Sequence, residues 1–222
     1  MIQNNNSTQK SLISDSPSDG VIFHDKKIIA LTGSISTGKS TAARIIKDMG
    51  FQIIDLDKIG HELYEDREVT EEINRAYGMN FTQRGVFDRK ALSKYVFEDK
   101  SRLETLNKIV HGKIFAKLIQ TIGESQEKII FVDIPLLIEL IEKKNNRLIY
   151  DEIWLVYVPM ETQIARLIKR DDIQREEALK KISSQMNIES KVKYADVLLN
   201  NEKDIPELEE QIHREIKRLR MK

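Results

Sequence analysis

The sequence predicts an α/β fold in which a parallel sheet is flanked by helices. Apolar runs of strand length, such as residues 27–32 and 128–133, alternate along the chain with segments of helical periodicity. A glycine-rich loop at residues 33–40 stands between the first apolar run and a helical segment at 41–49. This order of strand, loop and helix is typical of α/β proteins that bind phosphates. The other predicted strands are residues 51–55, 153–158 and 197–199.

The glycine-rich loop reads GSISTGKS and fits the pattern G-x-x-x-x-G-K-[ST] of phosphate-binding loops. Gly33 and Gly38 let several backbone N–H groups converge on one anion, because a side chain would obstruct those conformations. Lys39 adds a mobile cation for the outer phosphates of ATP, and Ser40 supplies a hydroxyl that can ligate Mg²⁺. The sequence therefore predicts ATP and Mg²⁺ as cofactors. The expected nucleotide contacts are Gly33, Ser34, Ile35, Ser36, Thr37, Gly38, Lys39, Ser40 and Thr41.

Composition narrows the class of protein. Among 222 residues, 36 basic side chains balance 36 acidic ones, which argues against a protein built mainly to coat nucleic acid. There is no cysteine, which suits a cytoplasmic protein and excludes thiol catalysis. No apolar run is long enough to cross a bilayer, so we expect no membrane partner. Residues 1–25 are polar and are expected to form a leader outside a single domain at residues 26–222.

Carboxylates follow two of the predicted strands. Asp55 and Asp57 come at the end of the second strand, and Asp133 ends the third. Since ligands bind beyond the carboxyl ends of parallel strands, these side chains should face the same crevice as the phosphate-binding loop. Asp57 could accept a proton from an attacking hydroxyl, and Asp133 could lie near Mg²⁺. Capping of the following helix by Asp57, and of a strand end by Asp133, stay open as alternatives.

Residues 62–122 are predicted to form an all-helical insert that holds the acceptor of the phosphoryl group. Helical periodicity dominates this segment, and its longest helix is expected at residues 101–122. His111 lies on that helix, where it either contacts the substrate or makes a helix-surface hydrogen bond. The core of the domain is then residues 26–61 and 123–222.

A lid is predicted at about residues 161–187. Arg166 and Arg170 are four residues apart on one helical face, and residues 171–174 interrupt the helix before it resumes at 175–186. Arginines at such a joint could bring positive charge to the transferring phosphoryl group and exclude water. The alternative is that both pair with neighbouring acidic residues.

One segment, Asp57–Gly60, fits the D-x-x-G motif of regulatory GTPases. The N-K-x-D sequence that reads guanine is absent: the segment at 107–110 reads NKIV and lacks the acidic residue. A GTP-driven switch is therefore disfavoured.

Taken together, the ordered motifs resemble the dephospho-coenzyme A kinase family from about residue 27 to the C-terminal helix. Its P-loop kinase fold would have a helical acceptor-binding insert and a helical lid. The matching stretches are LTGSISTGKST (31–41), IDLD (54–57), DRKAL (88–92), LNKIVH (106–111), VDIPLLIE (132–139), QIARLIKRD (163–171), ISSQ (182–185), and Ala195–Asp196 with Asn200. The resemblance implies transfer of the ATP γ-phosphoryl group to the ribose 3′-hydroxyl of dephospho-CoA, the last step of coenzyme A synthesis. We expect a monomer or weak homo-oligomer.

The resemblance also implies roles for individual residues. Asp57 would be the base, and Lys39, Arg166 and Arg170 would act on the phosphates. Substrate would contact Asp55, Asp57, Arg89 and His111, and the metal would lie at Ser40 and Asp133.

The chain departs from the family pattern at four positions: Ser34 and Ser36 replace Gly, Gly112 replaces Pro, and Lys181 replaces a lid Arg. Two other functions stay open. One is a nucleoside or nucleoside-monophosphate kinase of the same fold, and the other is a nucleotide-dependent switch or assembly ATPase.

Overall fold

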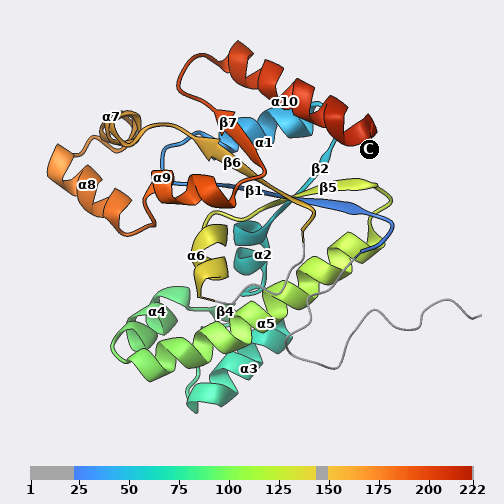
Figure 1. The fold of residues 1–222 in the computed structure, drawn as a ribbon. Helices are drawn as coiled ribbons and strands as arrows, with labels where there is room; N and C mark the ends of the chain where they lie inside the picture. The colour runs from blue at the N-terminus through green and yellow to red at the C-terminus, as the bar shows by residue number, and fades with distance from the viewer. Residues whose placement is uncertain (1–22, 144–149, 222) are drawn as a thin grey trace, which may run out of the picture.

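A five-stranded parallel sheet forms the centre of the computed structural model, which describes residues 23–143 and 150–221. The strand order β2-β5-β1-β6-β7 places β1, which leads into the phosphate-binding loop, in the middle (Figure 1). Leu31 of β1 lies opposite Asp133 of β5 and Trp154 of β6, so the carboxyl ends of these strands share one edge. The predicted α/β fold is confirmed. The strands are Lys27–Gly33 (β1), Gln52–Asp55 (β2), Ile129–Asp133 (β5), Glu152–Tyr157 (β6) and Val197–Asn200 (β7).

The sheet is covered on both faces because alternate side chains of β1 point to opposite sides. Ile29 and Leu31 belong to one buried cluster with α1 (Lys39–Asp48) and α10 (Ile205–Met221). Ile28 and Ala30 belong to the other. That second cluster includes side chains of α2 (Leu56–Glu62), α5 (Lys100–Glu124) and α6 (Leu137–Glu142). Figure 1 shows α1 and α10 on one side of the sheet and α2, α5 and α6 on the other.

The insert has a small core of its own, made of α3 (Arg67–Tyr77), α4 (Arg89–Phe97) and one end of α5. Side chains of Asp66, Asp88 and Asp99 cap these three helices.

The prediction that the insert is entirely helical is wrong. A hairpin of two-residue strands, β3 (Thr82–Gln83) and β4 (Val86–Phe87), precedes α4. Arg84 and Gly85 both have positive φ, 51° and 79°, which a two-residue hairpin turn requires. Strands of two residues are too short to show an alternating apolar pattern, so the sequence pattern did not predict them.

The two helices of the predicted lid, α7 (Met160–Asp171) and α8 (Arg175–Ser183), pack on each other through a separate small cluster. Ile35 of the phosphate-binding loop packs against that cluster, which joins the lid to the loop. The helix expected at 175–186 ends at Ser183. A short helix, α9 (Ile188–Lys191), and a 3₁₀ turn, Val192–Tyr194, lead on to β7.

The expected leader at residues 1–25 lies outside the described residues except for residues 23–25. Of these, Phe23 is partly buried against the second cluster. Among the described helices, none has both the length and the apolar composition needed to cross a membrane.

Candidate active site

The phosphate-binding loop connects β1 to α1 with little room for side chains. A Cβ atom on Gly33 would lie 2.7 Å from Thr37 Oγ1 and 3.1 Å from the Val156 carbonyl oxygen. Gly38 has φ 89°, a value that favours glycine. Thr37 stabilises the turn by donating its hydroxyl to the Ser34 carbonyl oxygen at 2.9 Å. Both glycines of the motif are therefore required by the local geometry.

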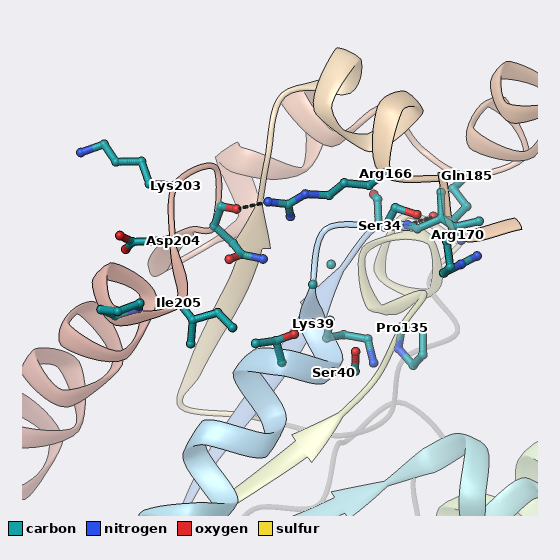
Figure 2. A pocket seen from close by; sticks show the side chains of 17 residues that line it. Ser34, Lys39, Ser40, Pro135, Arg166, Arg170, Gln185, Lys203, Asp204 and Ile205 are labelled. Carbon is teal, nitrogen blue, oxygen red and sulfur yellow. Dashed lines mark hydrogen bonds between the residues drawn. The ribbon is translucent and has the colours of Figure 1, made fainter. Parts of the chain in front are cut away.

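The loop forms one wall of a cavity of about 900 Å³ (Figure 2). All of the predicted nucleotide contacts line it except Thr37, whose side chain is buried within the loop. Arg166 and Arg170 of the lid also line the cavity. The remaining lining residues are Pro135, Gln185, Asn201, Lys203, Asp204, Ile205 and Pro206.

The two lid arginines differ in their contacts. Arg166 donates a 2.7 Å hydrogen bond to the backbone carbonyl of Asn201. Arg170 instead forms two hydrogen bonds with Asp171, of 2.7 and 3.3 Å, and its side chain is 57% exposed. Arg170 therefore pairs with an acidic neighbour, which was the alternative to a phosphate contact. Arg166 has no such acidic partner among the described residues. Lys181, where a lid arginine was expected, also contacts Asp171 at 3.2 Å.

Three carboxylates gather beside the loop at the carboxyl ends of β2 and β5. Asp133 is buried and forms an ion pair with Lys39. Burial raises the pKa of Asp133, the Lys39 ammonium opposes this, and the charges of Asp55 and Asp57 raise the pKa further. Asp55 lies directly opposite Asp133 in the β2–β5 register. Asp55 and Asp133 therefore lie at the edge of the sheet where β1 leads into the loop, and the expectation that the carboxylates face the crevice beside the loop stays a prediction.

The alternative that Asp57 caps the following helix is wrong, because Asp55 caps α2. The Asp55 side chain accepts the Lys58 N–H at 3.0 Å, whereas Asp57 is exposed in the first turn of the helix. Asp55 therefore accepts the free N–H at the start of α2, and the Asp57 carboxylate is accessible from solvent.

Oxygen ligands for Mg²⁺ are few. Among the described residues, no three His, Asp or Glu side chains converge as a metal site. The Ser40 hydroxyl and the Asp133 carboxylate, the predicted metal ligands, are oxygen groups of the kind that Mg²⁺ takes, and Mg²⁺ commonly keeps water and takes substrate phosphates as its other ligands.

Two of the predicted substrate contacts, Arg89 and His111, belong to the insert. The Arg89 guanidinium lies 4.9 Å from the centre of the Tyr64 ring, a cation–π contact. His111 is exposed on α5. Neither residue lines the cavity described above, nor do Asp55 and Asp57. Gly112 is exposed, and a Cβ atom there would meet no heavy atom of the described residues within 4 Å.

A family model described as dephospho-CoA kinase matches residues 27–207. The chain belongs to the dephospho-CoA kinase family. A dephospho-CoA kinase of Carboxydothermus hydrogenoformans is 42% identical over 83% of this chain and 90% of its own. Another from Fusobacterium nucleatum is 38% identical over 84% of this chain and 95% of its own.

Two solved structures support the fold of this dephospho-CoA kinase family member. TT1252 from Thermus thermophilus superposes with a TM-score of 0.71 at 32% identity, over 87% of this chain and 98% of that one. The dephospho-CoA kinase from Campylobacter jejuni superposes with a TM-score of 0.65 at 28% identity, over 87% of this chain and 97% of that one.

Two parts of the site were missed by the sequence-based predictions. Gln185, just after α8, accepts the Ile35 N–H at 2.9 Å through its side-chain oxygen. The wall at residues 201–206 follows β7. Because it follows the carboxyl end of a parallel strand, the rule that ligands bind there could have found this wall. Gln185 belongs to the ISSQ stretch that resembles the family, but its contact could not be predicted because its partner is 150 residues away.

Proposed function

We propose that this chain transfers the γ-phosphoryl group of ATP to the ribose 3′-hydroxyl of dephospho-CoA, giving coenzyme A and ADP. Family membership supports the reaction and its place as the final step of coenzyme A synthesis. The structural observation that carries it is the gathering of the phosphate-binding loop and the carboxylates of Asp57 and Asp133 at one edge of the sheet. Phosphates and an acid–base group can therefore meet in one place.

The nucleotide would bind in the cavity beside the loop. Loop N–H groups and the Lys39 ammonium would contact the phosphates, together with the α1 N-terminus. Arg166 lines the same cavity and would add a second cation. The opposite wall at residues 203–206, with Ile205 and Pro206 as apolar surface, would receive the adenosine.

Ser40 and Asp133 would hold the Mg²⁺ ion, directly or through water. When bound, the ion neutralises negative charge on the phosphates. The Lys39–Asp133 ion pair keeps both side chains at the end of β5, within reach of the same phosphates.

The acceptor would approach from the side of the insert. The Asp57 carboxylate would orient the 3′-hydroxyl and take its proton as the oxygen bonds to the γ-phosphorus and ADP departs. Asp55, Arg89 and His111 would contact the acceptor. Arg170 would supply charge from the lid, after exchanging Asp171 for a phosphate oxygen.

We further propose an insert at residues 62–122, a lid at about 161–187, and action in the cytoplasm as a monomer or weak homo-oligomer. The cysteine-free composition and balanced charge are consistent with this, with no nucleic-acid or membrane partner.

An acceptor panel tests the function. We expect ADP release to depend on dephospho-CoA and to be at least about 100-fold slower with nucleosides or nucleoside monophosphates. Faster turnover with a nucleoside monophosphate would favour the other kinase function. ATP hydrolysis that is independent of any acceptor would instead indicate a switch or assembly ATPase.

A further inference from the structure

Asn201 contacts the phosphate-binding loop, the predicted lid and the end of β6. It follows β7 directly, it is 7% exposed, and it lines the cavity. Its own N–H donates to the Tyr157 carbonyl oxygen at 2.9 Å, which fixes its backbone to the end of β6. Its remaining polar groups are thereby directed at the loop and at the lid. It lies outside the phosphate-binding motif, 161 to 168 positions after it.

The side chain of Asn201 fixes one peptide group of the loop. Its Nδ2 donates to the Thr37 carbonyl oxygen at 2.8 Å, a buried hydrogen bond. In a trans peptide the C=O and the following N–H point in opposite directions. Holding the Thr37 carbonyl toward Asn201 therefore directs the Gly38 N–H away from it. This keeps a carbonyl oxygen from turning toward an anion in the loop, where it would be repulsive.

The approach of Asn201 also explains why position 38 needs glycine. A Cβ atom on Gly38 would overlap Nδ2 of Asn201, and its next neighbour outside that residue would be Arg166, at 3.8 Å. The side-chain amide therefore occupies the space that a side chain at position 38 would take.

The backbone carbonyl of Asn201 contacts the lid. It accepts the 2.7 Å hydrogen bond from Arg166, which is drawn as a dashed line in Figure 2. The Arg166 guanidinium therefore lies beside Gly38. A shift of Asn201 would therefore move both the loop peptide and the cation expected above it.

We propose that Asn201 is a positioning residue that couples the phosphate-binding loop to the lid arginine Arg166. The proposal rests on the proposed function only in taking the cavity as an ATP site. It predicts that Asn201 sets affinity for the outer phosphates more than affinity for the adenosine end.

The test measures AMP, ADP and ATP binding by calorimetry for Asn201→Asp and Asn201→Ala, at a temperature where each variant is folded by circular dichroism. Asn201→Asp keeps the shape but replaces the donor with an oxygen that repels the Thr37 carbonyl. We expect ADP and ATP to bind at least about tenfold more weakly in both variants, and AMP to change by less than about threefold. A variant combining Asn201→Ala with Arg166→Ala should lose less than the product of the single losses, because the two act together.

Asn200→Ala is the matched control. Asn200 is the adjacent, exposed asparagine, and its side chain accepts the Glu202 N–H at 2.9 Å without contacting the loop. We expect its nucleotide affinities to be unchanged. Equal weakening of AMP, ADP and ATP in the Asn201 variants would show that the residue only supports the β7–α10 segment, and would overturn the proposal. Unchanged ADP affinity, or independent effects of Asn201 and Arg166, would overturn it as well. Because binding needs no acceptor, a failed acceptor panel would leave this test intact.

Discussion

The nucleotide end and the acceptor end of the proposed site are built differently. At the nucleotide end, Gly33, Thr37 and Asn201 form a packed and hydrogen-bonded frame around the loop, next to a cavity. At the acceptor end, Asp57 and His111 are exposed. We infer that the frame is formed before ATP arrives, whereas the acceptor itself brings the exposed groups together. The two ends should therefore respond to substitution in different measurements.

The largest expected effect is that of a substitution at Asp57, which should lower turnover without changing nucleotide affinity. Asp57→Asn should lower turnover by roughly 10²- to 10⁴-fold, since it removes the proposed proton acceptor. ADP affinity should stay within about twofold, because Asp57 does not line the nucleotide cavity. Steady-state kinetics and calorimetry measure the two quantities. Full activity of this variant would remove Asp57 from its proposed role.

The corresponding change at the nucleotide end is Gly38→Ala. The added Cβ displaces the Asn201 amide and strains a backbone with φ 89°. Together these should cost about 2 kcal/mol or more of binding free energy, or roughly 30-fold in ADP affinity.

Gly50→Ala is the control for backbone strain. Gly50 has φ 88°, but a Cβ atom there meets nothing within 4 Å. It should lower the free energy of unfolding by about 1 kcal/mol and leave ADP affinity unchanged. If both variants bound ADP normally, the nucleotide end would be less rigid than its contacts indicate.

A smaller effect concerns the serine at position 36. Ser36 has φ 61°, and its buried hydroxyl has no hydrogen-bond partner among the residues that the structure describes. Ser36→Gly should stabilise the protein by about 1 kcal/mol, since relief of strain and of the unpartnered hydroxyl exceeds the extra entropy of glycine in the unfolded chain. Urea unfolding measures this change.

Ser36→Ala separates the two causes, because it removes the hydroxyl and keeps the strain. It should give a smaller gain than Ser36→Gly. A loss of stability in Ser36→Gly would mean that the hydroxyl is bonded in solution.

The smallest expected effect is the pH dependence of the lid. The hydrogen bond from Arg170, followed by that from Lys181, lowers the pKa of Asp171 to about 2, below its ordinary value of 3.8. The ionised carboxylate is thus favoured in the folded state, so its stabilisation is present above pH 3.8 and is lost as pH falls toward 2. Thermal unfolding between pH 2 and 7 should show a slightly shallower acid loss for Asp171→Asn than for the wild type. Parallel profiles would mean that the Arg170–Asp171 contact adds no stability.

Much of the fold followed from the sequence because its signals are local. The strand of residues 27–32, the loop motif and helix α1 lie within 22 consecutive residues, 27–48, and each has its own pattern. The β3–β4 hairpin was missed, since two-residue strands have no period to detect. The end of α8 was placed three residues late, because Gln185 and Met186 form hydrogen bonds to distant partners, Ile35 and Glu139. A hydrogen bond to a distant residue cannot be predicted from the sequence near either partner.

By itself, the sequence determined the α/β order, the phosphate-binding loop and the carboxylates at the strand ends, because periodicity and motif spacing follow directly from backbone geometry. Only the tertiary structure decided that Asp55 caps α2, that Arg166 contacts Asn201 while Arg170 contacts Asp171, and that Asn201 lies against Gly38. These choices depend on which of several polar groups come within about 3 Å of one another, and only the packed sheet and its connections fix that distance.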